Sequence, residues 1–211
     1  MIRLLLADDH PVVREGLRRI VADNPGLEVV GEAVNGDEVL TVLRHSPADV
    51  VLLDISMPGP GFLQVLESLR SAHPTVAVLV LSMHPEDQYA VRALRSGAAG
   101  YLTKDHSPEQ LVEAIRKVHR GGRYVSPTLA ERLAADLATA GSRHVRHELL
   151  SHREYEVLCL LGSGRTVKEI SAELRLSPKT ISTYRARVLE KMQASTNADL
   201  VRYAAQHGLI R

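Results

Sequence analysis

Five polar residues stand where apolar segments of this chain end, and their types suggest metal-assisted chemistry. They are Asp8 and Asp9 after IRLLLA, Asp54 at the end of ADVVLLD, Ser82 at the end of VAVLVLS and Lys104 after AAGYLT. Neighbouring carboxylates such as Asp8 and Asp9 repel each other and cost stability unless a cation lies between them. A single aspartate after a strand is usually a turn former or a helix cap, so the interpretation depends on the whole set.

The carboxyl ends of parallel strands are where open α/β sheets bind ligands, at the point where the strand order reverses. Three carboxylates there would offer hard oxygen ligands to Mg²⁺, which takes one or two carboxylates together with water and phosphate oxygens. Asp54 could then attack a phosphoryl group as a nucleophile and become an aspartyl phosphate. Lys104 would offset charge on the transferred oxygens, and the Ser82 hydroxyl could donate a hydrogen bond to one of them.

The elements that position these residues follow from the hydrophobic pattern of the first 120 residues. Short apolar runs alternate with amphipathic segments, which predicts strands at 2–7, 27–33, 48–54, 76–82 and 98–103 and helices at 11–23, 36–46, 62–72, 85–97 and 107–121. This alternation predicts a parallel sheet with helices on both faces, and the continuous apolar runs fit strands buried on both sides. The predicted fold class is α/β, a doubly wound five-stranded parallel sheet.

The pattern changes after Gly121 and Gly122. We predict one further helix in SPTLAERLAADLATA, a linker in GSRHVRHE, and then four short helices in HREYEVLCLLGSG, TVKEISAELR, SPKTISTYRARVLEKM and TNADLVRYAAQHG. The predicted organisation is a first domain at 1–121, a linker with a helix at 122–147, and a small all-α four-helix domain at 148–211.

The second domain has the charge and the helix pattern of a DNA-binding unit. From Glu148 onward it carries ten Lys and Arg against seven Asp and Glu, and five of the ten lie between residues 175 and 191. Such a concentrated basic patch is more informative than the total charge. Ser177 followed by Pro178 is a strong helix start after a short break. A helix that begins there fits the DNA major groove, with its N-terminal part near base edges.

Composition sets the broad class of the protein. The 211 residues are 45% apolar and 24% charged, ordinary values for a globular protein, and the net charge is +1. Cys159 is the single cysteine and stands in an apolar run, so we expect a buried thiol and a reducing compartment. No run approaches the roughly 20 apolar residues that span a bilayer, and the N-terminal run is too short for a signal peptide. We expect a cytoplasmic protein without a membrane partner.

Four stretches of the first domain, ADDHPVVREGL, VVLLDISMPG, VLVLS and AAGYLTKD, resemble the receiver domain of two-component response regulators. The later LSHREYEVLCLLGSGRTVKEISAELRLSPKTISTYRARVLEKM resembles the LuxR-type helix-turn-helix. Together they resemble the NarL/FixJ family over essentially the whole chain. The resemblance implies a flavodoxin-like receiver and a helix-turn-helix domain, not an enzyme. It also implies a sensor histidine kinase as partner and a homodimer on promoter half-sites of double-stranded DNA.

The resemblance also implies roles for individual residues. Asp54 is similar to the phosphoacceptor, and Asp8, Asp9, Asp54 and the backbone carbonyl of Ser56 look like the ligands of Mg²⁺. Lys104 resembles the lysine that pairs with the phosphoryl group. Ser82 and Tyr101 resemble the coupled switch pair, in which the hydroxyl moves toward phosphate and the ring turns inward. Two departures, Phe62 in place of a common glycine and Gln64 in place of a common acid, predict a different loop beside Asp54.

Comparison with the family places Ser182, Thr183 and Ala186 against the bases. Because these side chains are small, we expect sparse direct readout, with methyl contacts and water-mediated bonds contributing. The other expected contacts hold the DNA backbone, although single basic residues on a helix are often only solvated. The full set of expected DNA-binding residues is Thr166, Lys168, Lys179, Thr180, Ser182, Thr183, Tyr184, Arg185, Ala186, Arg187 and Lys191.

Two rival functions use the same residues. A magnesium-dependent phosphatase could use Asp54 as its nucleophile, but such enzymes usually show an Asp-x-Asp spacing and a lid, whereas Asp8 and Asp9 are adjacent. The main alternative is a phosphate-independent DNA-binding regulator that uses its receiver only as a dimerisation module. A nucleotide-binding site is excluded because no Gly-rich phosphate loop follows the first strand.

Two smaller features have plain explanations. Leu200, Val201 and Ala204 in the last helix could form a dimer contact, but we favour packing in the core of the small domain. His144, His147 and His152 surround the linker in a polar, irregular context. We interpret them as solvated residues rather than a metal site, because no cysteine or second histidine set accompanies them.

Overall fold

The computed structural model describes residues 1–83, 86–138, 146–174 and 176–210. The chain divides into two compact units, Met1–Ala140 and Gly141–Arg211, and each is described by itself. Among the described residues, no helix has the length and apolar character needed to cross a bilayer.

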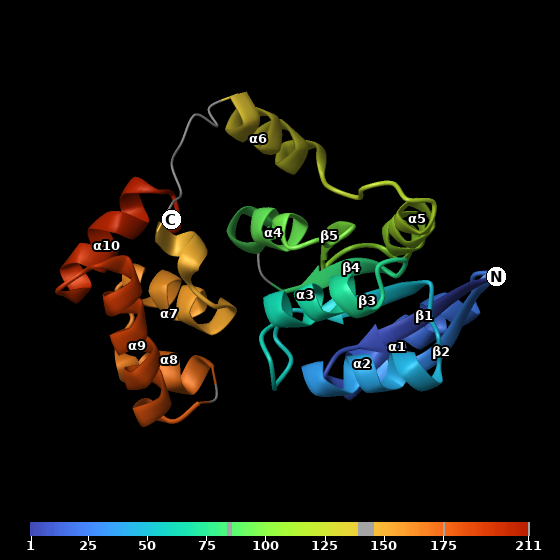
Figure 1. The fold of residues 1–211 in the computed structure, drawn as a ribbon, viewed down its shortest axis with the longest axis horizontal. Helices are drawn as coiled ribbons and strands as arrows, with labels where there is room; N and C mark the ends of the chain where they lie inside the picture. The colour runs from blue at the N-terminus through green and yellow to red at the C-terminus, as the bar shows by residue number, and fades with distance from the viewer. Residues whose placement is uncertain (84–85, 139–145, 175, 211) are drawn as a thin grey trace. The chain divides into compact units, whose positions relative to one another are not determined.

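The first unit is a parallel α/β fold (Figure 1). Its strands are β1 (Ile2–Ala7), β2 (Leu27–Ala33), β3 (Val50–Asp54), β4 (Ala77–Ser82) and β5 (Gly100–Thr103). Its helices are α1 (Pro11–Ala22), α2 (Gly36–His45), α3 (Phe62–Ala72), α4 (Glu86–Arg95), α5 (Pro108–His119) and α6 (Pro127–Ala138). The predicted α/β class and five-stranded parallel sheet are confirmed.

The strand order is β2-β1-β3-β4-β5, the flavodoxin-like order, and all pairs are parallel. The chain leaves β1 toward β2 on one side and later returns to place β3 on the other side. The switch point therefore lies between β1 and β3, where Ala7 pairs with Leu53 in register. Asp8 follows β1 and Asp54 ends β3, so both acids stand at this point.

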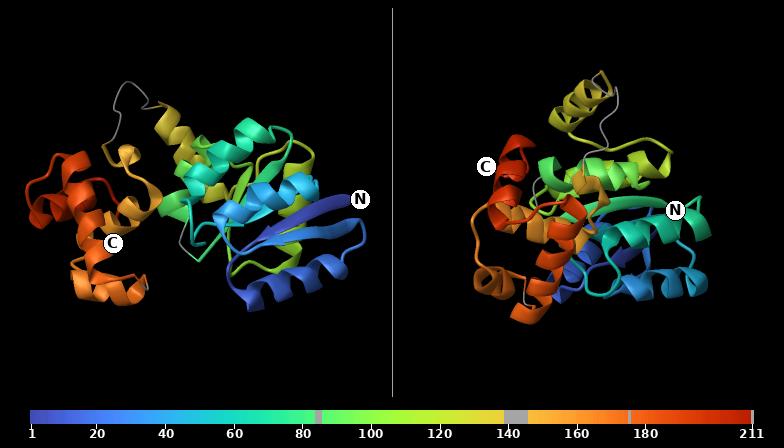
Figure 2. Two further views of the ribbon diagram at one scale, coloured as in Figure 1. Left: turned by 60° about the horizontal axis from the view of Figure 1, so that its bottom comes forward. Right: turned by 60° about the vertical axis from the view of Figure 1, so that its left-hand side comes forward.

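Helices cover both faces of the sheet (Figures 1 and 2). One face packs on α1 and α5, through strand residues such as Leu4, Leu52 and Leu79 and helix residues such as Leu17 and Ile115. The intervening strand residues point to the other face, and Leu5, Val51, Leu53 and Val80 are also buried. Helix α2 contacts α3, and α3 contacts α4, so these three helices form a row. Burial on both faces explains why the strands are continuous apolar runs.

The edge strand β5 has a further neighbour that the sequence pattern did not indicate. Tyr124 forms a parallel bridge with Gly100, and the amide of Tyr101 donates to the Tyr124 carbonyl at 3.1 Å. Ser126 then caps α6, accepting from the amide of Leu129 at 3.1 Å, and its hydroxyl donates to the Glu86 carboxylate at the start of α4. The segment that leads out of the sheet is thus anchored to β5 and α4.

The second unit is helical within its described residues. A 3₁₀ turn, η1 (Arg146–Leu149), precedes α7 (His152–Gly162), α8 (Val167–Glu173), α9 (Pro178–Met192) and α10 (Asn197–Gln206). The predicted four helices are present within two residues of their expected ends. Their core contains Ile170, Ile181, Val188, Leu200 and Ala204, each fully buried. Leu200 and Ala204 therefore serve packing, as favoured, while Val201 is 37% exposed.

Candidate functional site

The acidic residues meet at the carboxyl edge of the sheet in the first unit. One ligand atom each from Asp8, Asp9, His10 and Asp54 lies within 4.8 Å of the others. Asp8 and Asp54 are 1% and 2% exposed, so their carboxylates are buried rather than held in a solvated turn. The predicted convergence of the acids from β1 and β3 is therefore what the structure shows.

Lys104 reaches the same place from beyond β5. Its backbone amide donates to the Ser82 carbonyl at 2.7 Å, which extends the β4–β5 pairing by one residue. Its ammonium Nζ lies 2.6 Å from Asp8 Oδ2 and 2.9 Å from Asp54 Oδ2, with only 8% of the side chain exposed. Because β4 separates β3 from β5 in the sheet, the long lysine stem is needed to span this distance.

Burial and the charge of Lys104 act against each other in this site. Burial raises the pKa of Asp54 above its ordinary value, although Lys104 pulls in the opposite direction. Burial by itself would lower the pKa of Lys104, but the attraction of the Asp54 and Asp8 carboxylates outweighs it and the pKa is raised. One ammonium group thus faces two buried carboxylates, and Asp54 carries a negative charge that its surroundings only partly compensate.

Two buried oxygens in the cluster lack a hydrogen bond. Asp9 Oδ1 and Asp54 Oδ2 accept none from the described residues. His10 Nδ1, 2.8 Å from the first, and Lys104 Nζ, 2.9 Å from the second, are close charged or polar neighbours without hydrogen-bond geometry. Buried oxygens of this kind need a partner, and carboxylate oxygens suit a hard cation such as Mg²⁺. The donor set fits that ion.

Neighbouring loops hold the acids in place. The amide of Ser56 donates to Asp54 Oδ1 at 3.1 Å, and the amide of His10 donates to Asp8 Oδ1 at 2.8 Å. Ser82 and Tyr101, on the adjacent strands β4 and β5, are both fully buried. The Tyr101 ring therefore already lies inside the unit. All residues predicted for the phosphorylation chemistry are gathered at this edge or in the strands that lead to it.

Arg14 belongs to the site's support and was not singled out by the sequence. Its Nη1 donates to the Asp8 carbonyl at 2.7 Å, and its Nε pairs with Glu32 at 2.8 Å. It therefore ties α1 and the end of β2 to the loop that presents Asp8. The signal in the sequence was weak, because Arg14 is one of several arginines on an amphipathic helix.

The loop after Asp54 shows what the two departures do. Phe62 is the first residue of α3 and is 3% exposed, so its ring is part of the core. Gln64 is exposed on the same helix. Gly59, with φ +96°, takes a conformation that favours glycine. The substitution at Phe62 thus anchors this loop by burial, and Gln64 lies outside the acidic cluster.

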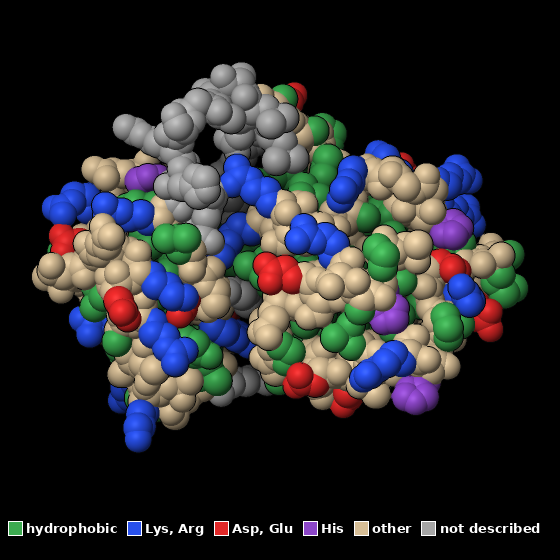
Figure 3. Space-filling model, viewed as in Figure 1, with side chains coloured by type: hydrophobic (Ala, Val, Ile, Leu, Met, Phe, Trp, Pro, Cys, Tyr) green, Lys and Arg blue, Asp and Glu red, His purple; other side chains and the backbone are tan. Residues whose placement is uncertain are grey.

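In the second unit, α8 and α9 form a helix-turn-helix. Thr166 and Glu169 make a capping box at the start of α8, and Ser177 caps α9 with Pro178 at its first position. The Ser171 hydroxyl donates to the Leu176 carbonyl at 2.6 Å and fixes the turn. Figure 3 shows Lys and Arg side chains on the visible face of this unit. The predicted DNA-facing residues Lys168, Lys179, Ser182, Thr183, Ala186 and Arg187 are exposed.

Two predicted base contacts have hydroxyls that are already engaged. Ser182 donates to the Pro178 carbonyl at 2.9 Å, and Thr183 donates to the Lys179 carbonyl at 3.0 Å. Such bonds to the preceding turn are common for Ser and Thr in helices. What these two exposed residues can still offer a base is acceptor lone pairs and the threonine methyl group. This strengthens the expectation of sparse direct readout.

Two basic residues of the predicted set have partners inside the unit. Arg185 donates to the Asn197 side chain at 2.7 Å, and Lys191 pairs with the buried Glu154 at 2.6 Å. Tyr184 and Thr180 are half-buried. The DNA contacts of Arg185 and Lys191 remain predictions, whereas their role in joining α9 to α10 and α7 is visible directly.

The linker histidines differ from expectation at one position. His147 is half-buried rather than solvated, and its Nδ1 lies 3.0 Å from the Tyr203 hydroxyl. Its ring packs against Tyr155, Tyr203 and His207 at centroid distances of 5.8–5.9 Å. The solvated interpretation was wrong here because the residue falls in η1, which packs on the helices. His144 and the side chain of His152 lie outside the described residues.

Both units match families of known proteins. Residues 4–116 match the family model of the response regulator receiver domain, and residues 148–204 match that of bacterial regulatory proteins of the luxR family. The chain belongs to the response regulators that carry a LuxR-type DNA-binding domain. The resemblance to the NarL/FixJ family is thereby confirmed, and this family comprises transcription regulators, not enzymes.

Several relatives of this response regulator match over nearly their whole length. The response regulator GacA of Pseudomonas viridiflava is 41% identical over 210 residues, covering 100% of this chain and 98% of the relative. UvrY of Escherichia coli K12 is 38% identical and covers 99% and 96% of the two chains. RcsB of Salmonella enterica serovar Typhimurium, solved bound to a promoter with the phosphomimetic BeF₃⁻, is 26% identical. It has a TM-score of 0.59 over 96% of this chain and 97% of its own.

Proposed function

We propose that phosphoryl transfer from a sensor histidine kinase to Asp54 controls dimerisation and DNA binding by this response regulator. The observation that supports this most strongly is the buried cluster in which Asp54 lies 2.9 Å from Lys104 and shares it with Asp8. A receiver domain implies a kinase partner, and such regulators act in the cytoplasm, where we place this one.

In the proposed transfer, an Asp54 carboxylate oxygen attacks the phosphorus of a phosphohistidine on the kinase. The new O–P bond forms as the P–N bond breaks, and the imidazole leaves with the bonding electron pair. Asp8, Asp9, Asp54 and the Ser56 carbonyl would hold Mg²⁺, which offsets charge on the transferred oxygens. Lys104 adds a positive charge already fixed beside Asp54. The Ser82 hydroxyl donates a hydrogen bond to the phosphoryl group.

The signal then passes to the edge of the sheet. Ser82 and Tyr101 belong to β4 and β5, and we propose that their rearrangement shifts a two-state equilibrium in the face formed by α4, β5 and α5. The Tyr101 amide is bonded to Tyr124, so a change in β5 reaches the segment that continues toward the DNA-binding domain. We retain domain boundaries at 1–121, 122–147 and 148–211 as predictions.

DNA recognition is assigned to α9 in the major groove. Ser182, Thr183 and Ala186 face the bases, while Thr166, Lys168, Lys179 and Arg187 contact phosphates. Thr180, Tyr184, Arg185 and Lys191 complete the proposed set. Among the solved relatives, two RcsB dimers bound to two parallel DNAs have been described, and by analogy we propose that a dimer of this chain binds paired half-sites.

The test uses the full chain treated with acetyl phosphate and Mg²⁺, the untreated chain, and the Asp54→Asn variant treated in the same way. Each is used to capture fragments of genomic DNA, and its mass in solution is measured by light scattering. We expect treatment to enrich specific fragments and to increase the dimer fraction only when Asp54 is present. Equal capture by all three samples would instead establish the phosphate-independent regulator.

A further inference from the structure

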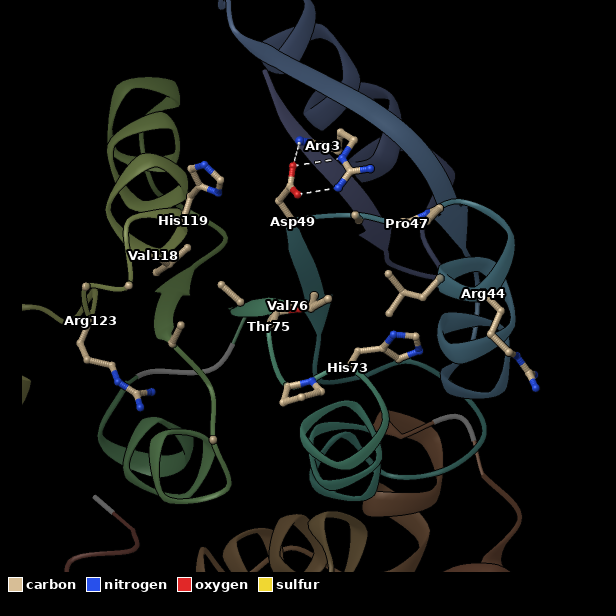
Figure 4. Close-up of a pocket in the computed structure, with 18 residues that line it drawn as sticks. Arg3, Arg44, Pro47, Asp49, His73, Thr75, Val76, Val118, His119 and Arg123 are labelled. Atoms are coloured by element: carbon tan, nitrogen blue, oxygen red, sulfur yellow. Dashed lines mark hydrogen bonds and ion pairs between the residues drawn. The ribbon is translucent and has the colours of Figure 1, made fainter.

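A cavity lies at the opposite edge of the sheet from Asp54. It has a volume of about 780 Å³ (Figure 4). Its walls come from the start of β1 and β4, the ends of α2 and α5, and the loops that lead into β3, β4 and β5. All of its lining residues belong to the first unit. None of them takes part in the phosphorylation site or in the DNA-binding helices.

The cavity is lined by more basic than acidic residues. Its ionisable lining residues are Arg3, Arg44, His73, His119, Arg123 and one acid, Asp49. That acid is already neutralised, because Arg3 Nη2 lies 2.8 Å from Asp49 Oδ1 and the Arg3 amide donates to Oδ2 at 2.8 Å. The Arg3 hydrogen bonds hold the pKa of Asp49 at about 2, so it stays ionised and paired. Asp49 also interacts electrostatically with His119. It is the one acid among the lining residues, so Arg44, His73 and Arg123 have no carboxylate of their own in the cavity.

Those basic groups keep most of their hydrogen-bond donors available. Within the described residues, the rings of His73 and His119 have no hydrogen-bond partner, and Arg44 donates only to the Thr41 hydroxyl at 3.2 Å. Arg123 donates one N–H to the Ala98 carbonyl, and a guanidinium has five such donors. Figure 4 shows His119 and Arg123 on one side of the cavity and Arg44 and His73 on the other.

Helix ends explain some of this charge but not all of it. A cation in the last turn of a helix is favoured by the helix dipole, which accounts for Arg44 in α2 and His119 in α5. Arg123 lies in the loop beyond α5. The run RKVHRGGR at 116–123 holds four Lys and Arg and no acid. Of the charged residues in this run, His119 and Arg123 line the cavity, and basic groups around a concave site raise the local concentration of anions.

The cavity also offers apolar surface between its charged sides. Leu43, Pro47, Pro74, Val76 and Val118 contribute to its lining. Small-molecule sites typically combine such apolar walls with a few polar groups that fix orientation. A purely inorganic anion would leave these walls unused. A DNA backbone would contact only the rim, because a duplex cannot enter a cavity of this size.

We propose that this cavity, the basal anion pocket, binds a small organic anion that joins a phosphate or carboxylate group to an apolar body. The basic side chains hold the anionic group, and the proline and aliphatic side chains cover the rest. Ligand binding here would act on the receiver from the edge opposite Asp54. The proposal is independent of phosphorylation and can fail or succeed without changing the function proposed above.

The experiment titrates the full, ¹⁵N-labelled chain with phenylphosphonate in the absence of Mg²⁺, followed by amide NMR shifts. The phosphorus of this probe is held by a carbon–phosphorus bond, so its phosphonate group cannot be transferred to Asp54. We expect saturable shifts at Thr75, Val76 and Gly122 and weaker binding of methylphosphonate, which lacks the apolar ring. Benzoate forms a parallel arm and separates a carboxylate ligand from a phosphate one. Arg44→Gln and Arg123→Gln should each weaken binding about tenfold, the loss expected for a charged hydrogen bond.

The matched control is Arg19→Gln, an exposed arginine on α1 outside the pocket, which should leave binding unchanged. Because Arg123 also bonds the Ala98 carbonyl, thermal unfolding of each variant is measured alongside, and Arg44→Gln provides the cleaner comparison. Three results would overturn the proposal. They are no saturable shift with either aromatic probe, equal weakening by Arg19→Gln, or displacement of the probe by short duplex DNA that shifts the same amides.

Discussion

The ammonium group of Lys104 lies 2.9 Å from the carboxylate of Asp54 and 2.6 Å from that of Asp8, with all three side chains at most 8% exposed. A single cation therefore balances two buried anions. Such an arrangement is poor for stability but well suited to receiving a further cation and a phosphoryl group. The partly compensated negative charge therefore serves the function of the site rather than the stability of the fold.

Removing the Lys104 ammonium group should lower the unfolding free energy. Lys104→Met leaves Asp8 and Asp54 buried without their cation, and breaking such a contact costs about 3 kcal/mol of unfolding free energy. Urea unfolding at neutral pH measures the loss. In the Asp54→Asn background the same substitution should cost less, because only Asp8 is then left uncompensated. Equal losses in the two backgrounds would mean that Lys104 and Asp54 are not coupled.

The contributions of Asp54 and Asp49, at the two ends of β3, to the stability of the fold should change in opposite directions with pH. Burial raises the pKa of Asp54, so the stability that its proton contributes is present below the ordinary value of 3.8 and is lost as pH rises through the folded-state pKa. Asp54→Asn, which cannot ionise, should therefore unfold at a higher temperature than wild type at neutral pH. This difference should shrink as the pH falls toward 3.8.

Asp49, just before β3, provides the matched comparison. Arg3 lowers its pKa to about 2, so its contribution is present above 3.8 and is lost as pH falls toward 2. Asp49→Asn should destabilise the fold at neutral pH by about 1 kcal/mol, a modest value because Arg3 is 45% exposed. Thermal unfolding of both variants across pH 3–8 checks the signs, and shifts in the same direction would contradict the assignment.

Substitutions in α9 should separate into those that change DNA binding and those that change stability. Arg187→Ala should weaken binding to all DNA sequences and lower the salt dependence, on a log–log plot, by about one. Thr183→Ala should instead change the preference among sequences. Lys191→Ala should cost about 1–3 kcal/mol of stability, since Glu154 is 4% exposed in its side chain and loses its cation. Fluorescence anisotropy against salt, with urea unfolding alongside, distinguishes these effects.

Gly100 should be required for the pairing of β5 with the segment after α5. A Cβ there would lie 2.8 Å from the Tyr124 carbonyl oxygen and 2.9 Å from Leu79 Cδ1. Gly100→Ala should therefore cost about 1–3 kcal/mol through overpacking and speed amide exchange at Tyr101. Gly16→Ala is the control, because nothing lies within 4 Å of its Cβ position in α1 and helix propensity should add about 0.5–1 kcal/mol. A neutral Gly100→Ala would show that the bridge is dispensable.

Much of the fold could be predicted from the sequence because its local signals agree with its tertiary structure. Continuous apolar runs predicted the strands, and Ser177 followed by Pro178 predicted a helix start that the structure confirms as capped. The acids at the ends of β1 and β3 were predictable for the same reason, since parallel strands bring their carboxyl ends together.

Side-chain pairs between distant segments could not be predicted. Nothing in the sequence distinguishes Arg14, which holds the Asp8 loop, from the neighbouring Arg18 and Arg19 on the same helix. The engagement of Lys191 by Glu154, 37 residues away, depends on the packing of α9 on α7. The bridge of Tyr124 to β5 was equally hidden, because a single paired residue leaves no periodic pattern.

Intact-protein mass spectrometry shows whether Asp54 accepts the phosphoryl group. Wild type, Asp54→Asn and Asp49→Asn are each incubated with acetyl phosphate, with Mg²⁺ and then with the metal chelated. We expect one added phosphoryl group on wild type and on Asp49→Asn in the presence of Mg²⁺, and none on Asp54→Asn. Equal phosphorylation of Asp54→Asn and wild type would contradict this expectation.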